Sequence, residues 1–217
     1  MNNILYEDNH LLVVVKNANI PVQKDDSNDI DLLTKLKEYL KVKYNKPGNV
    51  YLGLVHRLDR PVSGVMVFAK TSKAASRLSE QIRTKKFEKK YYAIIDGKLK
   101  NTEGIFKDKL LKNTKTNTTI ISDNGKEAIL NYKVLKIVNN LSLIDINLVT
   151  GRSHQIRVQF SSRHCPLYGD QRYNKNAQNG QQIALISYYL SFYHPISKEK
   201  MVFEIKCPDF YPWSLFN

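Results

Sequence analysis

The order of the apolar segments is the feature that most constrains the fold of this chain. Apolar runs of strand length outnumber the stretches with helical spacing, and the two kinds follow one another irregularly. A doubly wound parallel sheet would need regular alternation of strand and helix. The pattern therefore favours an α+β fold with a mixed, largely antiparallel sheet and a few flanking helices. Because no repeat, low-complexity stretch or linker divides the 217 residues, we predict one domain over 1–217.

The strand-length runs lie at 4–10, which ends in a turn, and at 11–15, 65–69, 91–95, 142–149 and 201–205. Residues 104–138 predict a β-meander. Within it, 123–126 is expected to form a hairpin turn, because the dipeptide Asn124-Gly125 accepts positive φ.

Helical spacing predicts helices at 29–43, 71–83 and 153–163. We expect Asp29 to cap the first helix. Its apolar face would comprise Ile30, Leu33, Leu36 and Leu40.

The charge balance indicates an anionic partner. Lys and Arg number 34 against 20 Asp and Glu, which gives a net charge of +14 and an isoelectric point of about 9.6. Such a field attracts polyanions, of which nucleic acid is the commonest. A basic protein without such a partner remains the alternative. No predicted helix joins a long basic face to a strongly apolar one, so a membrane role is not expected. The two cysteines lack metal-site spacing, and no targeting segment precedes the first strand, so we expect a cytoplasmic protein.

One unusual segment, 53–65, places His56, Arg57 and Asp59 between two apolar strands. A loop between strands is where a rigid sheet can present reactive groups. A lone aspartate is more often a cap or a surface carboxylate, so this segment by itself does not establish a catalytic residue.

Two further segments place charged residues at the start of a strand or at the start of a helix. Residues 88–93 form a basic cluster that leads into a strand containing Tyr91. The alternative interpretation of this segment is a strand end whose basic side chains are exposed to solvent and have no function. Residues 150–157 end a strand at a glycine and begin a helix that carries Arg152, His154 and Arg157. The alternative for this segment is a capped helix whose arginines face solvent.

Taken together, these segments resemble the RluA-type family of RNA pseudouridine synthases. Residues 56–64, His-Arg-Leu-Asp-Arg-Pro-Val-Ser-Gly, are similar to the family signature H-R-L-D-x-x-T-S-G. Residues 89–93 are similar to K-x-Y-x-A, and 150–157 to T-G-R-[ST]-H-Q-[IL]-R. Residues 164–170 look like the following G-H-P-[IL]-x-G-D. The resemblance runs from about residue 4 to the C-terminus, and three motifs in family order make it specific.

The chain departs from the family pattern in three places. Val62 replaces the usual threonine, and residues 16–19, Lys-Asn-Ala-Asn, replace K-P-A-G. Residues 185–187, Leu-Ile-Ser, stand where many relatives have Leu-His-Ala, so that histidine has no counterpart. The chain also begins directly with the catalytic domain, and we expect no separate N-terminal RNA-binding domain.

The resemblance implies a central active-site cleft in which Asp59 is the essential carboxylate. Arg157 would keep Asp59 ionised, since burial alone would favour its neutral form. Tyr91 would lie against the target base. Arg57 would enter the RNA as the uridine flips out of its stack. The other expected substrate-binding or orienting residues are His56, Arg152 and His154, and the candidate phosphate contacts are Lys85, Lys86, Lys89 and Lys90.

The implied reaction breaks the glycosidic bond of uridine and rejoins the uracil through carbon 5. No redox change occurs, so we expect no cofactor and no metal. The expected partner is a stem-loop of ribosomal or transfer RNA, and we expect the chain to act as a monomer. Two rival functions remain at this point: a non-catalytic RNA-binding protein, and a hydrolase of RNA or nucleosides that uses Asp59 as its base.

Overall fold

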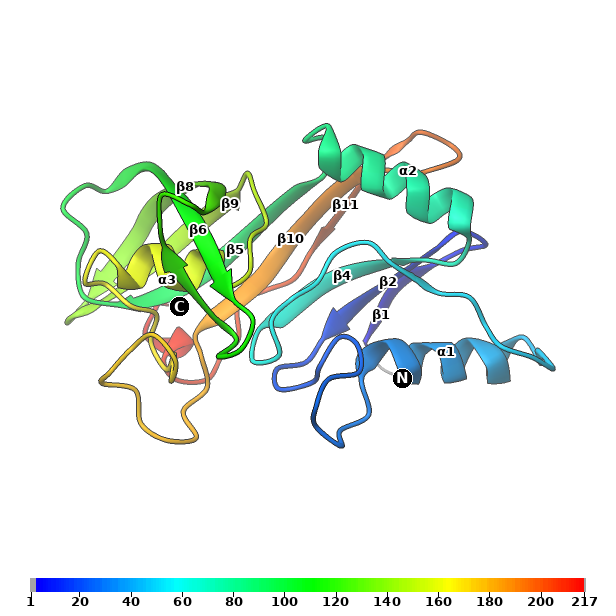
Figure 1. Cartoon of the computed structure of the whole chain (residues 1–217), viewed down its shortest axis with the longest axis horizontal. Helices are drawn as coiled ribbons and strands as arrows, with labels where there is room; N and C mark the ends of the chain where they lie inside the picture. Colours follow the sequence, from blue (N-terminus) through cyan, green and yellow to red (C-terminus); the bar gives the residue numbers. More distant parts are fainter. Residues whose placement is uncertain (1–2, 217) are drawn as a thin grey trace. The chain divides into compact units, whose positions relative to one another are not determined.

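The computed structural model describes residues 3–216, so Met1, Asn2 and Asn217 of the predicted domain lie outside the described part. The chain divides into two compact units. The first unit comprises Met1–Glu88 and Tyr189–Ile205, and the second comprises Lys89–Tyr188 and Lys206–Asn217. The strand β10 (Leu185–Tyr193) runs from the second unit into the first, and it can be followed in Figure 1.

The sheet of the first unit has the order β1-β2-β4-β10, with β11 paired to β10 and β3 paired to β4. These strands span Ile4–Glu7 (β1), Leu11–Lys16 (β2), Gly53–Leu54 (β3), Ser63–Ala69 (β4) and Lys200–Glu204 (β11). β2 and β4 are almost continuously apolar and buried along their length, as expected of strands covered on both faces. The helix α2 (Ser72–Arg83) packs Ala74 and Leu78 onto one of these faces.

The start of the first helix differs from the prediction. α1 spans Leu32–Lys43, and its cap is Asp31, whose carboxylate accepts the backbone N–H of Thr34 at 2.9 Å. The predicted cap, Asp29, was therefore wrong, and Ile30 is 62% exposed outside the helix. The carboxylate of Asp29 instead pairs with Arg60. The second helix is confirmed, and Thr71 caps it by accepting the N–H of Ala74.

In the second unit the strand order is β5-β9-β8-β6-β7, with antiparallel pairings from β5 to β7. The strands span Glu88–Asp96 (β5), Glu103–Asn113 (β6), Thr118–Ile121 (β7), Lys126–Val138 (β8) and Leu141–Leu148 (β9). The helix α3 (Gln155–Ser161), which lies within the predicted range 153–163, buries Ile156 and Phe160. A short 3-10 helix, η1 (Trp213–Leu215), follows near the C-terminus. The α+β class with a largely antiparallel sheet is confirmed.

Two predictions within the second unit were wrong. The chain from 104 to 138 is not a meander, because β7 and β8 both pair with β6, so that Leu110 faces Ile121 on one side and Lys126 on the other. The connection at 123–126 is therefore no hairpin, and Gly125 does not have a positive φ. A Cβ atom on Gly125 would lie 2.5 Å from the carbonyl carbon of Leu110, so glycine is required there for close backbone approach.

The sequence prediction missed β10 altogether. Its residues, Leu-Ile-Ser-Tyr-Tyr-Leu-Ser-Phe-Tyr, mix hydroxyl groups with apolar side chains, and this mixture hides the apolar run. Both Ser187 and Ser191 are nevertheless buried. Among residues 3–216 no helix has the length and apolar character needed to cross a membrane.

Candidate active site

The loop that carries Asp59 connects β3 to β4 in the first unit. Leu58 and Val62 are 7% and 2% exposed, so the loop is anchored in the core on both sides of Asp59. The backbone N–H of Val62 donates to the carbonyl oxygen of Asp59 at 3.0 Å and closes a turn. Asp59 itself is half-buried, and Arg57 and Arg60 are exposed. The loop thus presents one carboxylate and two guanidinium groups on a fixed backbone.

His56 supports this loop from within the first unit. Its Nε2 atom accepts the backbone N–H of Val67 on β4 at 3.0 Å. Its ring also meets Phe87 edge-on, with ring centroids 5.3 Å apart. These contacts fix the position of the His56 ring, and its expected role toward the substrate stays a prediction.

A lysine that the sequence analysis did not single out lies beneath the loop. Lys16, at the end of β2, is fully buried. Its ammonium donates to the carbonyl oxygens of Asn17, Ile20 and Arg60 at 3.0, 2.8 and 2.9 Å. Desolvation lowers the pKa of Lys16 to about 7, although the charge of nearby Asp59 acts in the opposite direction. The sequence feature that could have identified Lys16 is its position as the only charged residue of an otherwise apolar strand, Leu11–Lys16.

In the second unit, Tyr91 lies on β5 and is 5% exposed. It pairs in register with Ile146 of β9. Lys89 and Lys90, which precede it on the strand, are half-buried. Desolvation lowers the pKa of Lys89. By contrast, Lys85 and Lys86, which follow α2 in the first unit, are exposed.

The segment 150–157 is cross-linked by side chains. The hydroxyl of Thr150 accepts the backbone N–H of Ile129 at 2.7 Å and donates to Oε1 of Gln155 at 2.8 Å. The same Oε1 atom accepts the backbone N–H of Arg152 at 3.0 Å. Nε of Arg152 donates to the carbonyl oxygen of Glu127 at 2.8 Å. These bonds hold the turn that leads from β9 into α3.

His154 stands at the start of α3 with left-handed backbone geometry, at φ 53°. Its Nδ1 atom lies 2.7 Å from the hydroxyl of Tyr173. The same hydroxyl accepts the backbone N–H of Thr119 on β7 at 2.8 Å. Tyr173 therefore links the start of α3 to the hairpin of β6 and β7.

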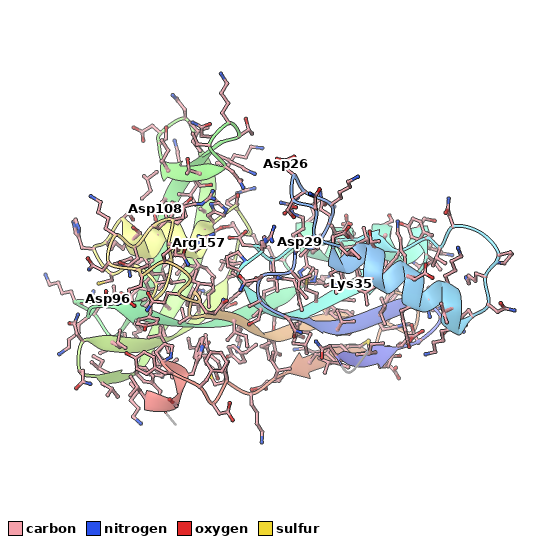
Figure 2. All side chains as sticks on the ribbon, turned by 90° about the horizontal axis from the view of Figure 1, so that it is seen from below. Asp26, Asp29, Lys35, Asp96, Asp108 and Arg157 are labelled. Atoms are coloured by element: carbon pink, nitrogen blue, oxygen red, sulfur yellow. The ribbon has the colours of Figure 1, made fainter. Side chains whose placement is uncertain are left out.

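Arg157 forms a buried two-point ion pair with Asp170. Nε and Nη2 of Arg157 donate to the two carboxylate oxygens at 2.8 and 2.7 Å, and the side chains are 7% and 0% exposed. The guanidinium carbon also lies 5.1 Å from the centre of the Tyr173 ring. Arg157 belongs to α3 and is labelled in Figure 2. Asp170 lies in the segment 164–170, which carries part of the family resemblance, but its pairing with Arg157 was not predicted from the sequence.

The candidate residues are divided between the two units. His56, Arg57 and Asp59 belong to the first unit, and Tyr91, Arg152, His154 and Arg157 belong to the second. The pairing of Arg157 with Asp59 and the active-site cleft therefore stay predictions. Within the described range 3–216, no three His, Cys, Asp or Glu side chains gather in a group suited to hold a metal ion.

Comparison with known proteins gives consistent matches. The family model for RNA pseudouridylate synthase matches residues 10–162. The ribosomal large subunit pseudouridine synthase C of Buchnera aphidicola subsp. Baizongia pistaciae is 34% identical over 212 residues, which are 93% of this chain and 65% of that protein. The ribosomal large subunit pseudouridine synthase D of Zymomonas mobilis is 35% identical over 220 residues, covering 95% of this chain and 69% of that protein.

Among solved structures, human RNA pseudouridylate synthase domain containing 4 has the same fold. Its TM-score is 0.81 at 23% identity, and the match covers 99% of this chain and 92% of that one. The chain spans 65% of the length of the Buchnera relative, which therefore has further residues outside the match.

Proposed function

Because the chain belongs to the RNA pseudouridylate synthase family, we propose that it isomerises uridine to pseudouridine in structured RNA, with Asp59 as the essential carboxylate. One observation carries this proposal: the region that matches the family model, residues 10–162, contains Asp59, Tyr91 and Arg157. The anchored loop around Asp59 supports it, because catalysis needs a carboxylate held in place while the base moves.

In this proposal the carboxylate of Asp59 acts as the nucleophile or as the group that stabilises departure of the uracil. The uracil then turns and rejoins the ribose through carbon 5, which loses its proton. Tyr91 stacks on the target base and relays that proton. Arg57 occupies the space that the flipped uridine leaves in the RNA. His56, Arg152 and His154 orient the loop and the substrate.

Arg157 is assigned the task of keeping Asp59 ionised. In this proposal the edge of the guanidinium formed by Nε and Nη2 binds Asp170, and the same guanidinium also acts on Asp59. A guanidinium suits this task because it is planar, always charged, and able to bind two carboxylates along different edges.

Both matched relatives named above are called ribosomal large subunit synthases, so the RNA of the large ribosomal subunit is the first candidate substrate. Transfer RNA is the second. The net charge of +14 favours binding of either RNA through its phosphates. We further propose that the protein acts in the cytoplasm, as a monomer.

A tritium-release assay tests the proposal. Large-subunit ribosomal RNA and transfer RNA, each transcribed with uridine tritiated at carbon 5, are incubated with the protein. Wild type should release tritium to water without cutting the RNA, and Asp59→Asn should not. Glu38→Gln, which changes an exposed carboxylate of the same unit, serves as the matched control and should keep full activity.

The rival functions give different results in the same assay. A hydrolase would release uracil or cut the RNA. A non-catalytic RNA-binding protein would release nothing, and Asp59→Asn would bind RNA as wild type does. Absence of tritium release from both RNA classes, and from unmodified total RNA, would overturn the proposal.

A second variant tests the role of Arg157. Arg157→Ala leaves the buried carboxylate of Asp170 without its partner, so misfolding must be separated from lost catalysis. Arg157→Lys keeps a positive charge but loses the planar two-edge geometry. We expect Arg157→Lys to fold, to bind RNA within about threefold of wild type, and to lose at least about 100-fold in kcat. Equal losses of binding and turnover would show that Arg157 mainly binds phosphate or supports folding.

A further inference from the structure

Arg60 directly follows Asp59, and aspartates of a surface loop hold its side chain. Its guanidinium pairs with Asp29, and its Nη1 atom lies 3.6 Å from a carboxylate oxygen of Asp25. The side chains of Arg60, Asp25 and Asp29 are 40%, 41% and 59% exposed. Ion pairs this exposed contribute little to folding, because water solvates both partners and salt screens them. Arg60 can therefore exchange these carboxylates for another anion at small cost.

The backbone of Arg60, by contrast, is fixed. Its carbonyl oxygen accepts a hydrogen bond from the buried ammonium of Lys16. The turn that begins at Asp59 closes through the N–H of Val62. The guanidinium of Arg60 can thus change partner while the backbone beside Asp59 stays in place.

The loop that holds Arg60 is unusually acidic for this chain. Residues 24–31 read Lys-Asp-Asp-Ser-Asn-Asp-Ile-Asp, in a protein whose net charge is +14. Asp31 caps α1, but Asp25 and Asp29 do not cap a helix. Figure 2 shows Asp26 at the tip of this loop and Asp29 nearer its return to α1. Because Arg60 directly follows Asp59, the carboxylates that pair with Arg60 belong to the surroundings of the candidate catalytic loop.

We propose that Arg60 is a phosphate-binding residue for the RNA strand beside the target uridine, and that Asp25 and Asp29 occupy its guanidinium until RNA displaces them. This inference rests on the proposed function of Asp59. The two non-bridging oxygens of a phosphodiester accept charge-assisted hydrogen bonds from a guanidinium, as the oxygens of a carboxylate do. The acidic loop then acts as a filter. An RNA that places a phosphate at Arg60 neutralises the guanidinium in place of the loop, whereas an RNA without a phosphate there leaves Arg60 paired with the loop.

The test compares two aspartates of the same loop. Asp29→Asn removes a charge that pairs with Arg60, and Asp26→Asn removes one charge from the tip of the loop. Binding of a fluorescein-labelled twelve-residue oligouridylate is measured by fluorescence anisotropy at several KCl concentrations. Asp29→Asn should bind about two- to fivefold more tightly than Asp26→Asn, which is the range that an exposed ion pair allows.

The same two substitutions are then made in the Arg60→Gln background. If Asp29 acts through Arg60, its advantage over Asp26→Asn disappears there. Arg60→Gln alone should also lower the slope of log affinity against log salt by about 0.7, the value for one phosphate contact on a single strand. Arg83→Gln is the matched control, because Arg83 is an exposed arginine of α2 that likewise pairs with a carboxylate, that of Glu80. Its slope should stay at the wild-type value.

Equal affinities of Asp29→Asn and Asp26→Asn would overturn the inference, and so would an advantage that persists without Arg60. An equal change of slope in Arg83→Gln would also contradict it. The readout is equilibrium binding and needs no turnover. Failure of the tritium-release assay would therefore refute the proposed function while leaving this binding result to be judged on its own.

Discussion

The ammonium of Lys16 lies 2.9 Å from the carbonyl oxygen of Arg60, so a buried lysine of β2 holds the backbone next to the candidate catalytic Asp59. All three hydrogen bonds of this ammonium go to backbone oxygens. A lysine is expensive to bury, and here it satisfies carbonyl groups of two loops at once. Lys16 therefore positions the loop that carries Asp59.

Replacing Lys16 with methionine should loosen that loop. Lys16→Met keeps most of the side-chain volume but leaves three carbonyl oxygens without their donor. We expect kcat in the tritium-release assay to fall by at least about tenfold, because small displacements of a catalytic group are costly. Lys24→Met, at an exposed lysine near in sequence, is the control and should be close to wild type.

The pH dependence of stability gives Lys16 a second readout. The pKa of Lys16 is about 7 in the folded chain, against an ordinary value of 10.5. Between these values the unfolded chain binds a proton that the folded chain does not, so this group makes the free energy of unfolding rise with pH. Urea unfolding from about pH 7 to 9.5 should show a smaller rise in Lys16→Met than in Lys24→Met. Identical pH profiles would mean that Lys16 is charged in the fold throughout this range.

Asp170→Asn should be one of the more destabilising single substitutions in the second unit. It leaves the guanidinium of Arg157 buried with a neutral partner, and breaking a buried pair in this way costs about 3–5 kcal/mol. The matched control is Asp108→Asn, whose partner Arg163 is 31% exposed. Because water reaches that pair, we expect a loss of about 1 kcal/mol there. Urea unfolding measures the free energy of unfolding of both variants. Equal losses would contradict the claim that the buried Arg157–Asp170 pair stabilises the fold more than the partly exposed Arg163–Asp108 pair does.

Glu7 should contribute stability that acid removes. Burial alone would raise the pKa of Glu7, but hydrogen bonds from Lys43, Tyr44, Lys70 and Tyr39 lower it to about 2. Since the folded pKa lies below the ordinary value of 4.5, this stability is fully present above about pH 4.5 and is lost as the pH falls toward 2. Glu7→Gln should lower the free energy of unfolding by about 2 kcal/mol at pH 7. This value is smaller than the pKa shift alone would give, because Lys43 is partly exposed and water weakens its interaction with Glu7.

The difference between wild type and Glu7→Gln should shrink between about pH 4.5 and 3, measured by thermal unfolding. Glu38→Gln alters an exposed carboxylate of α1 and is the control. A difference that stays constant with pH would show that Glu7 contributes by packing and not through its charge.

Gly125→Ala tests the close approach of the chain to Leu110. The added methyl group would meet backbone atoms, which cannot move aside as a flexible side chain can. We expect the free energy of unfolding to fall by about 1–3 kcal/mol, as it does at other sites where an added group is too large for the space. At Gly48 a Cβ atom meets nothing within 4 Å, so Gly48→Ala should change stability by less than about 1 kcal/mol in either direction. Thermal unfolding of both variants decides the matter, and a neutral Gly125→Ala would contradict the role given to Gly125.

The missed features share a physical cause. Asp29 was predicted to cap α1, but Asp31 does so, because the cap is the aspartate whose carboxylate reaches the backbone N–H of Thr34. The hairpin at 123–126 failed because Leu110 pairs on both of its edges, a pairing between segments far apart in sequence. β10 escaped notice because its serines are buried by neighbouring strands, and periodicity does not reveal such burial.

The roles of Asp59, Tyr91 and Arg157 were expected from the resemblance to the family, whereas local chemistry was enough to predict the α+β class, most strands and helices, and the three motif segments. Each of these depends on residues close together in the chain, where spacing and residue type act directly. Only the tertiary structure decided which distant groups support them: Lys16 beneath Asp59, Asp170 against Arg157, and Asp29 against Arg60. Such partners are determined by which groups become buried and by how far charged side chains reach in the folded chain. Neither can be predicted from the distance between two residues along the sequence.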